Sequence, residues 1–205
     1  MSESTKDLAK KGVVMVQVTS RELSATVPTR LIARHTVSGT AFRVAHHYWP
    51  KNAAWNRPGK NILFMTCFHV VESAEGQKCR LRCASHGPGS WVSGKICYAI
   101  PTLDFALIAV DLEEEEEDHD EECVHANDPF VSAPASILED TVELELLTSP
   151  IRAQQQKVFC VGFPLGYLEC YVSSGEIGGR NSGHVCDDYF SLDLSLNSGA
   201  FLELG

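Results

Sequence analysis

The chain has 205 residues, of which 44% are hydrophobic and 21% charged, so its composition is that of an ordinary globular protein and excludes a disordered or collagen-like chain. The net charge is −10, but residues 111–122 (DLEEEEEDHDEE) alone contribute ten of the 27 acidic side chains. The other 17 (27 − 10) balance the 17 basic residues, so we expect no large basic surface and no nucleic-acid partner.

The beginning of the chain, residues 1–12, is polar, and the longest apolar runs are as short as residues 105–110. These features predict neither a secretory signal nor a membrane span, and hence no membrane partner. Cysteine occurs eight times, but a chain of this length can build a core without disulfides. We therefore expect mostly reduced thiols in an intracellular, cytoplasmic protein.

Along the chain, the dominant pattern is an alternation of apolar and polar residues with period two, which is typical of strands. Residues 3–11 and 134–140 have only a weak helical pattern. Gly, Pro, Asn and Ser turns separate the strand candidates, which are residues 14–18, 38–44, 61–65, 78–84, 91–98, 105–110, 141–147, 158–163, 169–172 and 189–194. Many short strands between such turns predict an all-β barrel or sandwich.

Two segments interrupt this series of strands. Residues 45–60 contain two prolines and many polar side chains, and we expect a long surface loop with His46 and His47 solvated, as His184 would be further on. Residues 111–140 begin with the acidic run, whose like charges repel, so we expect a solvated linker. This linker divides the chain into two halves of similar strand content.

Three separate residues are candidates for catalytic chemistry. His69 closes an apolar strand, Asp104 directly precedes a buried strand, and Ser198 lies in the sequence Asn-Ser-Gly-Ala. Each alone has an ordinary reading, as a packed histidine, a strand-edge acid or a turn serine. Acyl transfer by serine, however, requires an imidazole base, a carboxylate that orients it, and N–H donors for the oxyanion. All three side-chain types are present, in the order His, Asp, Ser.

Six ordered segments resemble the trypsin-like serine proteases, most closely their HtrA/Deg branch. They are residues 38–42 (SGTAF), 62–71 (ILFMTCFHVV), 104–110 (DFALIAV), 162–166 (GFPLG), 172–177 (VSSGEI) and 197–200 (NSGA). The resemblance implies two antiparallel β-barrels with the active site between them. Residues 1–112 would be an N-terminal extension and first barrel, 113–140 the acidic linker, and 141–205 an incomplete second barrel, together one peptidase unit.

The resemblance also implies a role for each site residue. His69 would be the general base, Asp104 its orienting carboxylate and Ser198 the nucleophile that forms the acyl-enzyme. The backbone N–H groups of Ser198 and Leu196 would form the oxyanion hole. The implied activity is that of a serine endopeptidase that acts on protein or peptide substrates and needs neither a cofactor nor a metal.

Three departures from the family pattern favour an alternative, a catalytically impaired pseudoprotease that binds peptides or partner proteins. Leu196 occupies a position where the family has glycine, whose backbone freedom suits the oxyanion loop. The stretch between Asp193 and Asn197 is shorter than the family's loop. Only seven residues follow Ser198 (205 − 198), so the second barrel is expected to be truncated.

The cysteines support a third, unrelated hypothesis, a small zinc module. Cys79, Cys83, His86 and Cys97 could supply four ligands, although the first two lie on one face of a strand and are better read as inward-facing core residues. His119 lies within the acidic run and His125 just after it, where metal capture would be unspecific. A cysteine nucleophile is disfavoured because no cysteine precedes the Gly-Ala step.

Overall fold

The structure is a computed structural model of the chain, and it describes residues 3–23, 31–87, 90–112, 137, 139–146, 157–164, 167–180 and 190–194. Its helices and strands are α1 (Glu3–Lys11), β1 (Val13–Leu23), β2 (Leu31–Val44), β3 (Asn61–Thr66), α2 (Phe68–Val71), β4 (Lys78–Cys83), β5 (Val92–Ile100), β6 (Phe105–Asp111), β7 (Lys157–Gly162), β8 (Tyr171–Arg180) and β9 (Phe190–Leu194). Short 3₁₀ turns are η1 (His46–Tyr48), η2 (Glu75–Gln77) and η3 (Pro101–Leu103). The predicted all-β class is confirmed.

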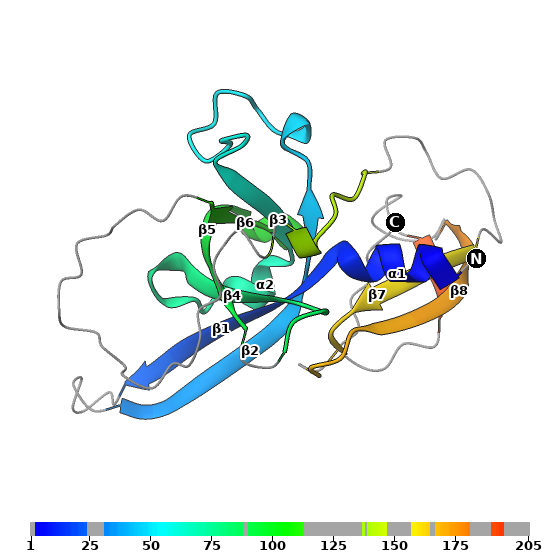
Figure 1. Ribbon diagram of the computed structural model, residues 1–205. Helices are drawn as coiled ribbons and strands as arrows, with labels where there is room; N and C mark the ends of the chain where they lie inside the picture. Colours follow the sequence, from blue (N-terminus) through cyan, green and yellow to red (C-terminus); the bar gives the residue numbers. More distant parts are fainter. Residues whose placement is uncertain are drawn as a thin grey trace.

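The first six strands form a closed antiparallel barrel in the order β1-β2-β3-β6-β5-β4 (Figure 1). Its interior is filled by alternate residues, such as Val14 and Val16 of β1 and Phe64 of β3, all fully buried. Burial of each such side chain contributes about 1.5–3 kcal/mol. Strand β6 is apolar on both faces, because Ile108 packs inside the barrel and Leu107 packs against a second cluster outside it. The predicted barrel is therefore present, and its period-two pattern is the reason for it.

Strands β1 and β2 are longer than the alternation predicts. They pair from Val13↔Phe42 to Leu23↔Leu31, so the hairpin extends beyond the rest of the barrel (Figure 1). The sequence pattern predicted strands only over residues 14–18 and 38–44. The outer part of the hairpin includes polar residues such as those at 19–22, so no apolar alternation marks it, although backbone pairing continues.

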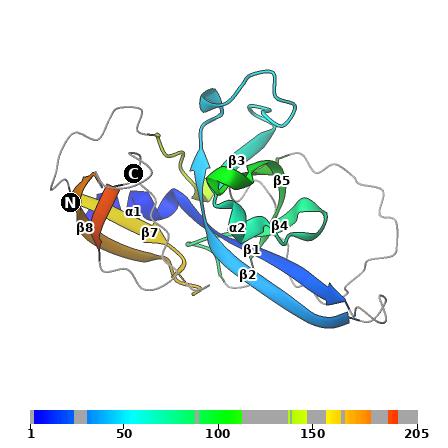
Figure 2. The ribbon, with the colours of Figure 1, turned by 180° about the vertical axis from the view of Figure 1, so that it is seen from behind.

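In the second half, the described residues form a three-stranded antiparallel sheet, β7-β8-β9, which is a partial second barrel. Val161 and Phe163 pack against Val13 and Met15 of β1, and this buried cluster joins the sheet to the first barrel. Helix α1 lies beside β7 in both ribbon views (Figures 1 and 2) and contributes the partly buried Ala9 to the same cluster.

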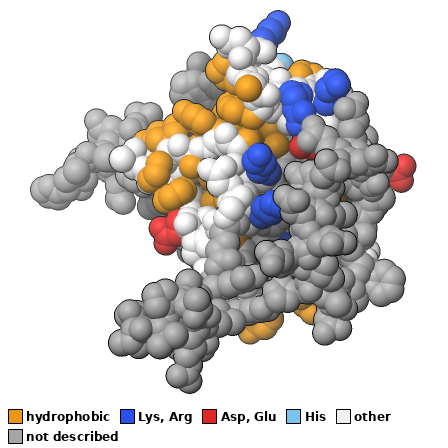
Figure 3. Space-filling model, turned by 90° about the vertical axis from the view of Figure 1, so that its left-hand side faces the viewer, with side chains coloured by type: hydrophobic (Ala, Val, Ile, Leu, Met, Phe, Trp, Pro, Cys, Tyr) orange, Lys and Arg blue, Asp and Glu red, His pale blue; other side chains and the backbone are white. Residues whose placement is uncertain are grey.

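The space-filling view shows one face of the molecule with hydrophobic side chains beside several Lys and Arg side chains (Figure 3). Asp and Glu are sparse among the described residues of that face. This distribution agrees with the sequence, in which the excess of negative charge lies in residues 111–122.

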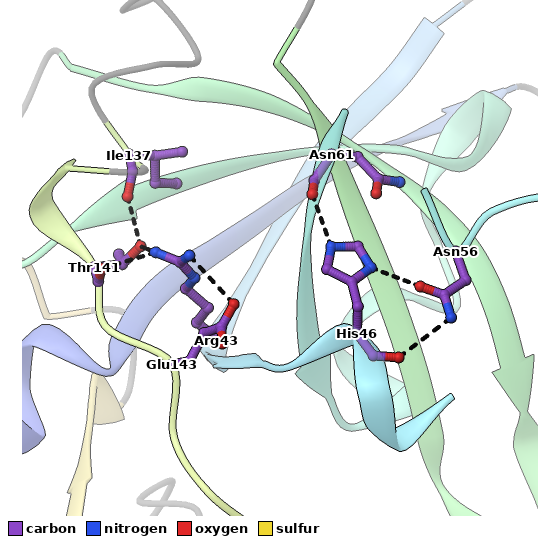
Figure 4. Close-up of polar contacts among 7 residues, drawn as sticks. All are labelled: Arg43, His46, Asn56, Asn61, Ile137, Thr141 and Glu143. Atoms are coloured by element: carbon purple, nitrogen blue, oxygen red, sulfur yellow. Dashed lines mark hydrogen bonds and ion pairs between the residues drawn. The ribbon is translucent and has the colours of Figure 1, made fainter. Parts of the chain in front are cut away.

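The segment 141–147 was predicted as a strand. Its described residues, 141–146, make only an isolated parallel bridge, between Leu144 and Val44. The described residues 139–146 lie against β2, where Arg43 donates to the carbonyl of Thr141 at 2.8 Å and pairs with Glu143 at 3.4 Å (Figure 4). Thr141 in turn donates from its hydroxyl to the carbonyl of Ile137, which is fully buried. Two backbone hydrogen bonds also hold the segment, from the N–H of Val142 to the carbonyl of Lys11 and from the N–H of Leu144 to the carbonyl of Arg43, each at 3.0 Å. Single contacts of both kinds, rather than a strand ladder, therefore hold these residues.

The expectation that His46 is solvated is wrong. Its Nδ1 lies 2.6 Å from the side-chain oxygen of Asn56 and its Nε2 lies 2.9 Å from the carbonyl of Asn61 (Figure 4). Asn56 is buried and donates back to the His46 carbonyl at 3.2 Å. The segment 45–60 is thus tied to the start of β3, while His47 is exposed as predicted.

Candidate active site

His69 lies just after β3, on the single turn of α2. Val70 and Val71 of this turn are buried in the barrel interior, which directs His69 outward, about half exposed. Gly39 makes room for this packing, because a Cβ at that position would lie 2.7 Å from the Val70 side chain. The sequence Phe-His-Val-Val therefore closes one end of the barrel with its valines and presents the histidine at the surface.

Asp104 lies between η3 and β6 with left-handed backbone angles (φ 50°, ψ 43°). Asp is among the few residues other than glycine that adopt this conformation readily. The carbonyl of Asp104 accepts a hydrogen bond from the N–H of Phe68 at 3.0 Å, which joins the loop before β6 to the start of α2.

The pairing of β3 with β6 explains why His69 and Asp104 meet. The two strands are antiparallel, with Thr66 opposite Ala106, so the end of β3 lies beside the beginning of β6. A residue just after β3 and a residue just before β6 are therefore neighbours, although 35 positions separate them.

Two hydrogen bonds connect the carboxylate of Asp104 to His69. Oδ2 lies 2.7 Å from Nδ1 of the imidazole, and Oδ1 accepts the backbone N–H of His69 at 2.8 Å. Partial burial alone would raise the pKa of Asp104. The hydrogen bonds from the His69 N–H and ring, the charge interaction with His69 and a hydrogen bond from the Cys67 thiol outweigh this, and lower the pKa below its usual value. The carboxylate is therefore ionised at neutral pH, and it holds His69 by one hydrogen bond to the ring and one to the backbone.

Ser198 and Leu196, the predicted nucleophile and oxyanion-hole residue, lie outside the described residues. The described chain reaches β9, which ends at Leu194. Of the four predicted site residues, the structure thus describes His69 and Asp104 and brings them together, while the roles of Ser198 and Leu196 stay predictions.

Cys67 is a site residue that the sequence pattern did not single out. It lies two positions before His69, and one ligand atom from each of Cys67, His69 and Asp104 falls within 4.8 Å of the others. The signal in the sequence is the Cys-Phe-His spacing. Cys67 directly precedes α2, and its thiol hydrogen-bonds to the Asp104 carboxylate.

The ligands of the alternative zinc-module hypothesis do not assemble. Cys79 is buried inside the barrel, where burial and then the neighbouring Cys97 raise its pKa to about 12. His86 pairs instead with Asp140, at 2.5 Å from Nε2 to the carboxylate. Among the described residues, the Cys67–His69–Asp104 cluster is the only group of three or more His, Cys, Asp or Glu side chains placed to hold one ion.

Residues 39–201 match the family described as the trypsin-like peptidase domain. Because this match covers most of the chain, the protein belongs to the trypsin-like peptidase family. Family membership also argues against the zinc-module hypothesis.

Ninety-seven chains of solved structures match the fold. The crystal structure of Deg5 is similar with a TM-score of 0.51 and 17% identity, covering 98% of this chain and 79% of that chain. This likeness is one of fold. No curated protein matches the sequence. Within the described residues, no helix is both long and apolar enough to cross a membrane.

Proposed function

We propose that the protein is a serine endopeptidase that uses His69, Asp104 and Ser198 as its catalytic triad. The observation that carries the proposal is the His69–Asp104 pair, with Nδ1 held 2.7 Å from a carboxylate oxygen at an exposed end of the first barrel. In a chain of the trypsin-like peptidase family, this pair has the geometry that a serine nucleophile requires.

The pair determines which imidazole nitrogen is available as a base. When Nδ1–H donates to Asp104, the lone pair of the neutral ring is on Nε2. Nε2 would take the hydroxyl proton of Ser198 as its oxygen attacks the scissile carbonyl, and would then protonate the leaving amine. Asp104 stabilises the imidazolium formed in between. The resulting acyl-enzyme would be hydrolysed by water, with Nε2 again acting as the base.

The oxyanion of each tetrahedral intermediate would be bound by the backbone N–H groups of Ser198 and Leu196. The second candidate function, a peptide-binding pseudoprotease, is favoured by the leucine at 196, because the family's glycine permits a backbone conformation that a side chain disfavours. Loss of one such donor typically lowers the rate by about a hundredfold to a thousandfold.

Labelling with a fluorophosphonate, followed by mass spectrometry, tests the proposal. We expect a single adduct, on Ser198, and no adduct in Ser198→Ala or His69→Ala, because triad residues act as a unit. Ser174→Ala is a matched control, since Ser174 is an exposed serine that also precedes a glycine, and it should label normally. Labelling that persists in Ser198→Ala would refute the triad. A folded wild-type protein that never labels would favour the pseudoprotease.

A further inference from the structure

The cluster of Cys67, His69 and Asp104 includes a thiol that the proposed peptide hydrolysis does not use. A thiol, an imidazole and a carboxylate have one donor atom each within 4.8 Å of one another. The side chains of His69 and Asp104 are about half exposed, and Cys67 is partly buried beside them. An ion could therefore reach the cluster from solvent without any opening of the barrel.

This set of donors matches one class of cation. Thiolate and imidazole ligands suit Zn²⁺, whereas Ca²⁺ and Mg²⁺ prefer oxygen ligands only. Bond lengths of about 2.0–2.3 Å in a tetrahedral site place its ligand atoms about 3.3–3.8 Å apart. Small rotations of the three side chains would bring their donor atoms, which lie within 4.8 Å of one another, to that spacing. Three protein ligands would leave the fourth position to water.

We propose that Cys67, His69 and Asp104 form a Zn²⁺ site, and that the ion reversibly inhibits the enzyme. The inhibitory part rests on the proposed function, whereas the binding part does not. The thiol proton of Cys67 passes to solvent when the ion binds. An ion on Nδ1 of His69 displaces the hydrogen bond to Asp104 and leaves the remaining ring proton on Nε2. An ion on Nε2 occupies the lone pair directly. In either case His69 has no lone pair to accept the serine proton.

Direct metal binding is measured first, by titrating the full chain with Co²⁺ as a Zn²⁺ analogue. We expect a thiolate-to-cobalt charge-transfer absorption that one equivalent of Zn²⁺ abolishes and that Ca²⁺ does not affect. Cys67→Ser retains a hydroxyl donor for Asp104 but removes the sulfur ligand. This variant should lose that absorption, and its Zn²⁺ affinity by calorimetry should fall by more than about a hundredfold, because loss of an outer-shell partner alone already costs about ten- to a hundredfold and Cys67 is a direct ligand. Circular dichroism checks that it folds.

Cys97→Ser is the matched control, because Cys97 is also a partly buried thiol but donates to the carbonyl of Leu107 on β6. Its cobalt absorption should equal that of the wild type. Binding to the acidic run alone would produce no thiolate absorption. An absorption retained in Cys67→Ser, or lost in Cys97→Ser, would overturn the site.

The inhibitory part is tested by fluorophosphonate labelling in the presence of Zn²⁺. We expect Zn²⁺ to suppress labelling of the wild type, EDTA to restore it, and Cys67→Ser to require a correspondingly higher Zn²⁺ concentration. Labelling unaffected by saturating Zn²⁺ would overturn the inhibition while leaving the serine protease proposal intact. Cobalt binding by a chain that never labels would support the metal site and refute the protease.

Discussion

At the scale of single residues, local chemistry explains the placement of the candidate catalytic pair. The valines of α2 direct His69 outward, and the left-handed backbone of Asp104 directs its carboxylate back toward the ring. Neither feature depends on the second half of the chain. Both residues of the pair therefore come from the first barrel, and the proposed activity depends also on Ser198 in the second half of the chain.

Leu196 is the residue whose substitution should raise the proposed activity. In Leu196→Gly the chain regains the backbone freedom that the family's oxyanion loop uses, and we expect peptide turnover to increase by roughly a hundredfold. Leu196→Ala is the control, because it shortens the side chain without permitting positive φ, and it should gain little. Cleavage of an unfolded protein substrate, compared with Ser198→Ala, measures this. Equal gains from both variants would show that side-chain size is the cause.

Cys79 should make the free energy of unfolding of the barrel decrease as the pH rises in the alkaline range. Burial, and then Cys97, raise its pKa from 9.0 to about 12 in the folded protein. The stabilisation from keeping this thiol neutral is complete below pH 9.0 and is lost as the pH rises through the folded value. In urea unfolding, Cys79→Ala should reduce the loss of stability above pH 9.0 by up to about 1.4 kcal/mol per pH unit.

Val92→Ala is the control for Cys79→Ala. Val92 is equally buried in the same core cluster but does not titrate, so its truncation should lower stability by a similar amount at every pH. A pH slope that is the same in Cys79→Ala and the wild type would contradict the assignment.

At the scale of elements, a hydrogen bond on Thr40 connects the second half of the chain to the first barrel, and a second one on the same residue joins two strands of that barrel. The hydroxyl oxygen of Thr40, on β2, accepts a buried hydrogen bond from the N–H of Phe163, the residue after β7, at 2.8 Å. The carbonyl of Thr40 accepts the hydroxyl of Thr66, which ends β3, also at 2.8 Å. A Cβ at Gly162 would lie 2.7 Å from the Thr40 hydroxyl, so the backbone of β7 approaches Thr40 too closely for a side chain at position 162.

Thr40→Val should therefore destabilise the protein more than its small change in shape suggests. The methyl group that replaces the hydroxyl leaves the N–H of Phe163 buried without an acceptor, at a cost of about 1–3 kcal/mol. Thr40→Ser retains the acceptor and should lose less. Urea unfolding of the three proteins measures the difference, and equal stability of the Val and Ser variants would show that this hydrogen bond contributes nothing to stability.

At the scale of the whole molecule, the acidic run separates two anchored points of the chain. Before it, β6 ends at Asp111 and the N–H of Leu112 donates to the carbonyl of Lys60 at 2.9 Å. After it, Ile137 is buried in the core of the first barrel. The division into residues 1–112, 113–140 and 141–205 stays a prediction, which the following deletion tests.

Deletion of residues 113–122 should remove nine acidic side chains and no strand. We expect the melting temperature to change by only a few degrees, corresponding to roughly 1 kcal/mol or less for a solvated segment. Replacement of the same acidic residues by glutamine retains the loop length and separates the effect of charge from that of chain length. A calcium-dependent melting shift that the deletion abolishes would instead assign the run a specific metal-binding role.

The sequence predicted correctly those features that depend on residues a few positions apart, and it missed those that depend on residues further apart. The barrel strands around Phe64 and Ile108 were predictable, because burial of alternate residues leaves its mark within a few positions. The outer β1–β2 hairpin was not, because backbone pairing between polar residues leaves no such pattern. His46 was misread as solvated for a related reason, since its partner Asn56 lies ten residues away and no local pattern reports a side-chain pair.

By itself, the sequence determined the β class, the first barrel and the trypsin-like peptidase family, because local alternation and short motifs carry that information. It also singled out His69 and Asp104 as candidates. Only the tertiary structure decided that they touch, since their contact depends on the antiparallel register of β3 and β6 across 35 positions. The same register brings the Cys67 thiol to the Asp104 carboxylate. That proximity is a property of the folded barrel, because no local pattern in the chain encodes which strand ends become neighbours.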